Sequence, residues 1–221
     1  MSAVVSSACQ DEPAESLSSL HDFSSTAVVF DAAADTLSGQ ALVDVEFGSV
    51  GGDALTVPDC QELTALDFDT LSGRDYTRAL SYNEDCAAVG LYMGGRDAKN
   101  SFFRDDELED WVPNLPNAVL PDLSGDGILD TAQPVGSASD YAVARSSPGR
   151  VVFRAHGFDV DVRQLALRDV DGDGSEDAIL RFAYGVPDGS WRGHKTFFVS
   201  RDGKGAPFQV KSTTDSGGLV Q

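Results

Sequence analysis

The residues best suited to chemistry lie close together in one acidic stretch, DVDGDGSEDAIL at positions 169–180. Counted from its first residue, carboxylates stand at positions 1, 3, 5 and 9, which are Asp169, Asp171, Asp173 and Asp177. Glycines at positions 4 and 6 permit a tight curl that turns alternate residues inward, and Ser175 at position 7 offers its backbone carbonyl. Carboxylates held this close repel one another unless a cation neutralises them. The spacing therefore predicts a Ca2+ site made of hard oxygen ligands.

An earlier stretch, DLSGDGILD at residues 122–130, repeats this spacing. Its ligand positions are Asp122, Ser124, Asp126, Ile128 through its carbonyl, and Asp130. Because Ser124 replaces a carboxylate, we expect two Ca2+ sites, of which the 169–177 loop is the stronger. The competing interpretation is that both stretches are ordinary Asp-Gly turns that hold no ion.

The 169–180 stretch begins with the spacing of an EF-hand loop. It departs from that pattern at Leu180, where an EF-hand has a bidentate Glu, and no amphipathic helix follows. With the strand-like AILRFAY after it, the 169–177 loop resembles instead the calcium loops of FG-GAP/VCBS repeats, a family found in integrin-type propellers and many bacterial surface proteins. The family pattern D-x-D-G-D-G-x-x-D is matched at every motif position, and the resemblance covers residues 116–200. It implies β-rich units, Ca2+ in a structural role and a place outside the cytoplasm.

The segments that must position these loops have the sequence pattern of short β-strands. Runs rich in β-branched and aromatic residues alternate with clusters of Gly, Asp, Asn and Ser. The expected strands span residues 25–32, 40–50, 53–57, 65–71, 87–94, 150–162, 164–170, 177–185, 194–203 and 207–212. One helical pattern interrupts them at 101–112, where Phe103, Leu108 and Trp111 would share a face. We predict an all-β fold, either a β-sandwich or a partial propeller-like β domain, with two calcium-binding DxDGDGxxD-type loops.

The chain divides into four regions by composition. Residues 1–25 are small, polar and acidic and are expected to form a flexible tether. A β-rich region is expected over 26–115, a β domain with both calcium loops over 116–215, and a flexible tail over 216–221. The boundary between the two large regions is placed near WVPNLPNAVLP (111–121), because three prolines in eleven residues break regular structure.

The three cysteines give two further expectations. Cys60 and Cys86 each follow an acidic, turn-like stretch, and they form either a disulfide or two unrelated thiols. Cys9 stands before a Ser/Glu-rich stretch in a context that resembles a bacterial lipoprotein processing site, so it is a candidate for lipidation. Ala8 and Ser7 suit that pattern, whereas Ser6 stands where Leu is usual and no complete signal peptide is visible. No apolar run approaches the ~18 residues of a transmembrane helix.

Charge and motif content disfavour several function classes. The formal net charge is −20, which argues against nucleic acid and anionic membranes as partners. His21, His156 and His194 form no zinc motif, and no G-x-S-x-G nucleophile motif occurs. The exposed pair in DGSWRG, Trp191 and Arg192, would suit a sugar or protein contact, but the favoured interpretation is an ordinary hairpin loop with Trp191 folded onto the core.

These observations favour a non-catalytic, extracytoplasmic calcium-binding β protein, secreted, periplasmic or lipid-anchored at the surface. It would serve as a binding or structural protein stabilised by Ca2+, with an extracellular protein or a glycan as partner. Two alternatives remain open at this stage. One is a secreted hydrolase or lyase that acts on polysaccharide and uses Ca2+ as a structural aid, and the other is a subunit of an extracellular assembly.

Overall fold

The computed structural model describes residues 45–103, 108–122 and 129–212. Its centre is a six-stranded antiparallel sheet in which every strand pairs with its neighbours in the chain. The strands are β3 (Ala142–Ser147), β4 (Arg150–Ala155), β5 (Phe158–Arg168), β6 (Asp177–Gly185), β7 (Arg192–Ser200) and β8 (Gln209–Ser212). Most of this sheet lies in segments expected to be strands, and the fold is mostly β as predicted. The single strand expected at 150–162 is wrong, because a turn at His156 and Gly157, both at positive φ, divides it into β4 and β5. The strand expected at 164–170 contributes residues 164–168 to β5. The strand β6 is buried along its whole length, so the sheet is covered on both faces at this strand, whereas all residues of the edge strand β3 are exposed.

One face of the sheet packs against a layer of short helical segments. The segments are α4 (Leu108–Trp111), η3 (Val112–Asn114), η4 (Asn117–Val119) and η5 (Val135–Ser137). Their apolar side chains form one buried cluster with alternate residues of the strands, such as Phe153, Val160 and Phe182. The proline-rich stretch 111–121 therefore belongs to the same core as the sheet.

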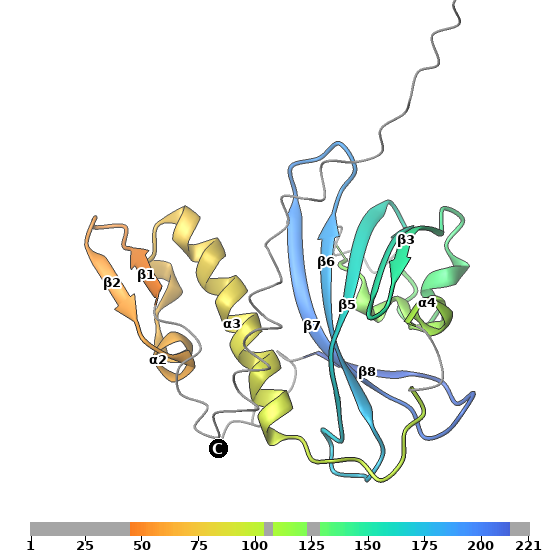
Figure 1. Ribbon diagram of the computed structural model, residues 1–221. Coiled ribbons are helices and arrows are strands. Elements are labelled where there is room, and N and C mark those ends of the chain that lie inside the picture. The colour runs from red at the N-terminus through yellow and green to blue at the C-terminus, as the bar shows by residue number, and fades with distance from the viewer. Residues whose placement is uncertain (1–44, 104–107, 123–128, 213–221) are drawn as a thin grey trace, which may run out of the picture.

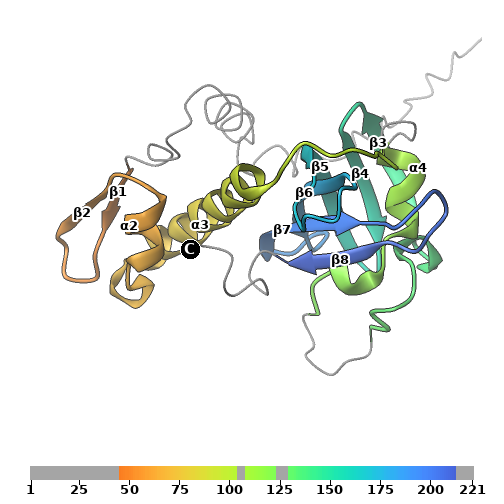
Figure 2. The same ribbon diagram turned by 90° about the horizontal axis from the view of Figure 1, so that it is seen from below.

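The opposite face packs against the 22-residue helix α3 (Gly73–Gly94). Ala88, Val89 and Leu91 of the helix contact Ile179 and Phe198 of the sheet in a second buried cluster. Figure 2 shows α3 and α4 on opposite sides of the sheet. Helical segments, rather than a second sheet, thus cover both faces in the described residues, which is not the packing of a β-sandwich.

The strand expected at 87–94 is wrong, because these residues end α3. The helix begins where the Ser72 side chain accepts a hydrogen bond from the Asp75 N–H, and its buried residues Ser81, Ala88 and Leu91 recur at helical spacing. Tertiary packing of this face outweighs the β propensity of the run AAVGLYMG. Of the helical pattern expected at 101–112, residues 104–107 lie outside the described residues, Leu108–Trp111 form α4, and Val112 begins a 3-10 turn.

A small lobe lies on the far side of α3 from the sheet (Figure 1). It contains the hairpin of β1 (Val45–Gly48) and β2 (Ala54–Val57), the helix α2 (Cys60–Ala65) and the turn η2 (Phe68–Thr70). The hairpin confirms the strands expected near 40–50 and 53–57. The strand expected at 65–71 is wrong, because Asp67 caps η2 by accepting from the Asp69 N–H. The strand expected at 25–32 lies outside the described residues.

The predicted disulfide between Cys60 and Cys86 is present, with 5.5 Å between the two Cα atoms. It joins α2 to α3 across a core whose buried apolar residues are Phe47, Val57, Leu63, Leu71 and Ala79. A core this small gains much from a covalent closure. The disulfide therefore holds the lobe to the helix that also contacts the sheet.

We expect the double variant Cys60→Ser/Cys86→Ser to lose about 3 kcal/mol of unfolding free energy, because the unfolded chain regains the entropy of an open loop. Denaturant titration under non-reducing conditions measures this loss. Cys9→Ser is the matched control and should leave the midpoint unchanged. An unchanged midpoint in the double variant would mean that the lobe is stable without the bond.

Candidate metal centre

The β5–β6 loop brings together three of the carboxylates expected to bind metal. Asp169 directly follows β5 and Asp177 begins β6, and these two side chains are buried while Asp171 is exposed. One carboxylate oxygen from each of the three lies within 4.8 Å of the others. Three hard oxygen donors at such separations form a partial coordination shell for a divalent cation.

The loop curls because its carboxylates accept hydrogen bonds from its own backbone. Asp169 accepts from the N–H of Gly172 at 2.8 Å and of Gly174 at 3.0 Å, and Asp177 accepts from the N–H of Val170 at 2.8 Å. The curl places both glycines at positive φ, 84° at Gly172 and 89° at Gly174. These are the left-handed conformations that the sequence pattern required of them.

Asp173 has a structural contact of its own in the loop. It is not in the group of three, and its Oδ1 accepts a 2.6 Å hydrogen bond from the Ser175 N–H. Such an Asx turn helps to shape the loop, and the ligand role expected of Asp173 stays a prediction. Ser175 forms a parallel bridge with Asn100 that uses the Gly174 carbonyl and the Glu176 N–H, so the Ser175 carbonyl is not part of that bridge.

Burial and like charge oppose the ionisation of Asp177. Burial raises the pKa of Asp177 to about 6, and the charges of Asp171 and Asp173 add to the rise, although the hydrogen bond from the Val170 N–H opposes it. Near neutral pH this site therefore has a marked affinity for a positive charge, which a proton or a metal ion supplies.

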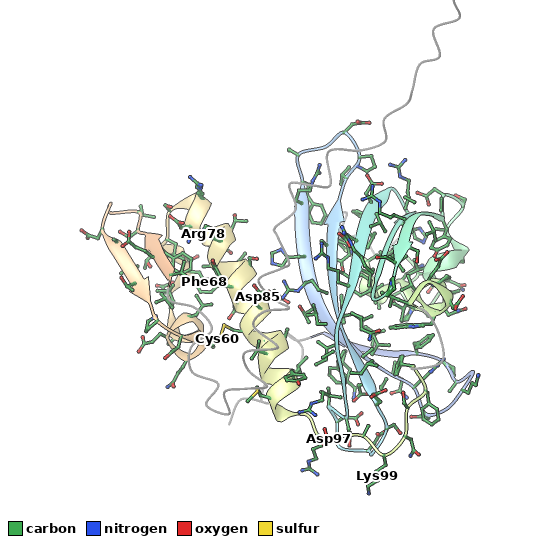
Figure 3. The ribbon with its side chains drawn as sticks, in the orientation of Figure 1. Cys60, Phe68, Arg78, Asp85, Asp97 and Lys99 are labelled. Carbon is green, nitrogen blue, oxygen red and sulfur yellow. A yellow bond between two sulfur atoms is a disulfide. The ribbon has the colours of Figure 1, made fainter. Side chains whose placement is uncertain are left out.

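The segment that follows α3 forms hydrogen bonds with the backbone of the 169–177 loop, and the sequence did not predict this contact. We call residues 96–101 the loop clamp. The Arg96 N–H donates to the Asp169 carbonyl at 2.8 Å and the Asp169 N–H donates back at 3.0 Å. Lys99 and Asn100 both donate their N–H groups to the Gly174 carbonyl, at 2.9 and 3.2 Å. Figure 3 shows Asp97 and Lys99 on this segment below α3.

Side chains reinforce the loop clamp. Asp97 forms an ion pair with Arg168, whose guanidinium lies 4.7 Å from the centre of the Tyr92 ring. Ser101 donates a hydrogen bond to the buried carboxylate of Glu176. A Cβ at Gly95 would lie 3.0 Å from the Cβ of Arg168, so glycine allows the helix end to approach the strand this closely. The loop is thus held between the end of α3 and the sheet.

One cationic side chain already lies near the exposed side of the group. The Lys211 ammonium is 3.9 Å from Asp171 Oδ2 and 5.2 Å from the centre of the Phe198 ring. The lysine is half exposed, so its attraction for the carboxylate is weakened by water. A divalent cation carries twice the charge and offers direct coordination.

The second predicted loop is only partly within the described residues. Ser124, Asp126 and Ile128 lie outside them, whereas Asp122 and Asp130 lie at its two ends. Asp130 accepts from the Ala132 N–H through Oδ1 at 3.1 Å and from Asn117 Nδ2 through its carbonyl at 3.1 Å. The second Ca2+ site stays a prediction, and so does lipidation of Cys9, which also lies outside the described residues.

Trp191 and Arg192, the candidate pair in DGSWRG, make contacts within their own loop and with the core. Arg192 donates to the carbonyls of Val186, Gly189 and Trp191 within its own loop, and the Trp191 ring packs edge-on against Phe158 at 6.1 Å. These contacts agree with the interpretation of DGSWRG as an ordinary hairpin loop. His156 occupies the β4–β5 turn, His194 lies in β7, and His21 is outside the described residues.

Comparison of the chain with protein-family models, with curated proteins and with solved structures found no match. Within the described residues, no helix combines the length and the hydropathy needed to span a membrane. The case for a function therefore rests on the residues and geometry of the chain itself.

We expect Asp177→Asn to stabilise the metal-free protein at neutral pH by roughly 2–3 kcal/mol. The carboxyl titrates near its usual value of 3.8 when unfolded and at about 6 when folded. Its contribution to stability is therefore full below pH 4 and is lost as the pH rises to 6, and the neutral amide avoids this loss while still accepting from Val170. Denaturant titration in chelator at pH 4 and pH 7 measures it.

Asp202→Asn removes an exposed carboxylate outside the loop and serves as the control, with no such gain expected. If Asp177→Asn destabilised the chelated protein at pH 7, the electrostatic account of the loop would be wrong.

We expect Gly172→Ala to cost about 1–2 kcal/mol, because a Cβ there meets no atom within 4 Å but must adopt a left-handed backbone. Gly203→Ala is the matched control, since that glycine also has open space and has no positive φ. Thermal unfolding of both variants compares them. Equal stability of the two would show that the loop backbone is not held in this conformation.

Proposed function

We propose that this protein is a non-catalytic, calcium-binding protein that works outside the cytoplasm, where it serves as a surface or secreted binding or structural protein. The observation that carries the proposal is the convergence of Asp169, Asp171 and Asp177 in a glycine-shaped loop, where burial opposes the ionisation of Asp177. A bound Ca2+ would relieve the repulsion and fix the loop.

The ligand chemistry favours Ca2+ over other metals. All three side-chain donors are carboxylates, and Ca2+ accepts six to eight oxygen ligands in irregular geometry, whereas Mg2+ demands a near-octahedral shell. Asp173 and the Ser175 carbonyl stand next in the loop and would join the shell with water. The same residues match the FG-GAP/VCBS loop pattern, in which Ca2+ is usually structural.

Two features support the compartment. The Cys60–Cys86 disulfide is typical of oxidising surroundings, and extracellular calcium modules commonly bind with dissociation constants of roughly 10⁻⁴–10⁻³ M. Lipid attachment at Cys9 would place the protein at a surface. A weaker second Ca2+ site at residues 122–130 belongs to the same proposal.

The structural role follows from the loop clamp. An ion that fixes the 169–177 loop also fixes the backbone that bonds to Arg96, Lys99 and Asn100, and through them the end of α3. Calcium would therefore stabilise the junction of sheet, helix and lobe rather than one isolated turn.

We expect Ca2+ in excess over chelator to raise the unfolding free energy by about 2.7 kcal/mol at 100 times the dissociation constant. Asp171→Asn should remove most of that gain, because Asp171 supplies the exposed carboxylate of the group and an amide is a weaker ligand. Thermal unfolding in Ca2+, Mg2+ and chelator measures the shift.

Asp202→Asn is the control with the same change in charge, and it should keep the full shift. The double variant Asp171→Ala/Asp173→Ala should lose the shift completely. No shift in the wild type, or a full shift in the double variant, would mean that DVDGDGSED is only an acidic turn. The proposed function would then be refuted.

A further inference from the structure

The chain contains five Asp–Gly pairs, and this dipeptide rearranges in proteins without an enzyme. One pair, Asp126–Gly127, lies outside the described residues. The other four begin at Asp171, Asp173, Asp188 and Asp202. All four of these aspartates are exposed, so contact with water does not distinguish them. What distinguishes them is the bonding of the glycine that follows each one.

The rearrangement involves only the two residues and water. The glycine nitrogen attacks the carbon of the protonated aspartate carboxyl group, the N–H proton and the carboxyl O–H leave together as water, and a succinimide ring forms. Water then opens the ring. When the bond between the nitrogen and the main-chain carbonyl carbon breaks, the product is isoaspartate, whose backbone runs through the side-chain carbon. No oxidant or reductant takes part, and the mass of the chain is unchanged.

The bonding of the glycine N–H controls this reaction, because the nitrogen must lose its proton and turn toward the side chain. A hydrogen bond donated by the N–H has to be broken first. An anionic acceptor adds a second obstacle, since its charge opposes the negative nitrogen that forms when the proton leaves. The hydrogen bonds of the four glycines therefore predict which pairs react.

The two glycines of the 169–177 loop both donate to the carboxylate of Asp169. The Gly172 N–H donates to Oδ1 at 2.8 Å, and the Gly174 N–H donates to Oδ2 at 3.0 Å. The loop clamp holds the other side of Gly174, whose carbonyl accepts from the N–H groups of Lys99 and Asn100 at 2.9 and 3.2 Å. Both nitrogens are thus held by an anionic acceptor.

The aspartate side chains of these two pairs are held as well. Asp171 Oδ1 accepts from the Asp173 N–H at 3.2 Å, and Asp173 Oδ1 accepts from the Ser175 N–H at 2.6 Å. Each Asx turn directs a carboxylate toward the nitrogen two residues ahead and away from the glycine nitrogen between them. Neither pair has the geometry of attack.

A tight turn protects the third pair, Asp188–Gly189. The Gly189 N–H donates to the Val186 carbonyl at 3.0 Å. A Cβ at Gly189 would lie 3.1 Å from the Cβ of Val186, so the turn is closely packed. The nitrogen is held by a hydrogen bond and by its surroundings.

The fourth pair, Asp202–Gly203 in the β7–β8 loop, lacks such protection. Within the described residues, the Gly203 N–H donates no hydrogen bond, and a Cβ at Gly203 would meet no atom within 4 Å. The exposed Asp202 accepts through Oδ2 a long hydrogen bond of 3.4 Å from Gln209 Nε2. Both reacting groups therefore have room to approach each other.

We propose that Asp202–Gly203 is a site of spontaneous isoaspartate formation in this protein, and that Asp169 protects the two Asp–Gly pairs of the 169–177 loop from the same reaction. Isoaspartate adds one carbon to the backbone of the β7–β8 loop. Arg201 and Phe208 flank this loop, with the guanidinium 5.2 Å from the centre of the Phe208 ring. The modification thus lengthens the connection to the edge strand β8 and leaves the carboxylates of the 169–177 loop unchanged.

The test is to age the purified protein in chelator, at neutral pH and below its unfolding temperature. Its peptides are then separated by chromatography and analysed by mass spectrometry that distinguishes isoaspartate from aspartate. We expect at least about tenfold more isoaspartate at Asp202 than at Asp171, Asp173 or Asp188, which is the rate factor of one hydrogen bond that must be broken. Ageing in concentrated guanidinium should remove this preference, because the unfolded chain protects no pair.

Two variants separate the reactive site from the protecting residue. Asp202→Glu should abolish the main product, because the longer side chain would have to close a six-membered ring, and Asp188→Glu is its matched control. Asp169→Asn should bring isoaspartate to Asp171 and Asp173, because a neutral amide has one acceptor oxygen and no charge. Asp159→Asn changes the charge equally in the sheet and should leave the loop pairs unreacted.

Amide hydrogen exchange of the wild type tests the protection without any variant. The N–H groups of Gly172, Gly174 and Gly189 should exchange at least about tenfold more slowly than that of Gly203, since their hydrogen bonds must open first. This measurement keeps the proposal testable if Asp169→Asn does not fold.

Several results would overturn the proposal. Isoaspartate spread evenly over the four pairs of the folded chain would show that the structure does not select a site. A folded Asp169→Asn protein whose loop pairs stay unreacted would show that Asp169 does not protect them. Equal exchange of the four glycine N–H groups would contradict the bonding on which the selection rests. All measurements are made in chelator, so none of these results depends on Ca2+ binding.

Discussion

The pairing of the loop clamp with the 169–177 loop is the contact on which the arrangement of the molecule depends. Five buried apolar residues make up the cluster between α3 and the sheet, and this is a small contact for a helix of 22 residues. The backbone hydrogen bonds from residues 96–101 extend that contact and fix where the helix ends. The lobe is bonded in turn to α3 by the disulfide. The end of α3 is thus held at the strand end where the three carboxylates converge, and the lobe is joined to the sheet through this helix.

The pKa values of acidic residues in this chain shift in two opposite directions. Hydrogen bonds from the Gly48 N–H and the Ser72 hydroxyl lower the pKa of Asp75. Burial acts the other way on Asp140, but the N–H groups of Gly157 and His156 outweigh it and lower its pKa. At Asp177 burial prevails and the pKa rises. The direction of the pKa shift distinguishes carboxylates that the protein stabilises by hydrogen bonds from a carboxylate that still lacks a positive partner.

Local patterns in the sequence predicted those parts of the structure that local forces determine. The Asp-Gly loop, its left-handed glycines, most strands of the sheet and the cysteine pair follow from spacing and residue type. The strand expected at 87–94 failed because a helix face completed by Ile179 and Phe198 outweighs local propensity. The loop clamp was not predicted from the sequence, because Arg96 and Asn100 pair with residues more than seventy positions away. The hydrogen bond between Asp173 and the Ser175 N–H was not predicted, because spacing alone does not show which side chains also form turns.

The order of strands in the sheet has a consequence for how the chain reaches this structure. Every strand from β3 to β8 pairs with its sequence neighbour, so the sheet has short loops to close and low contact order for an all-antiparallel domain. The helix α3 and the loop clamp precede the sheet in the chain, but α3 finds its partners in β6 and β7 and the loop clamp finds its partners in the β5–β6 loop. During synthesis from the N-terminus, the apolar stripe of α3 therefore has no surface to bury until about residue 200 has emerged. The disulfide closes within the earlier part and keeps the helix attached to its lobe through that interval.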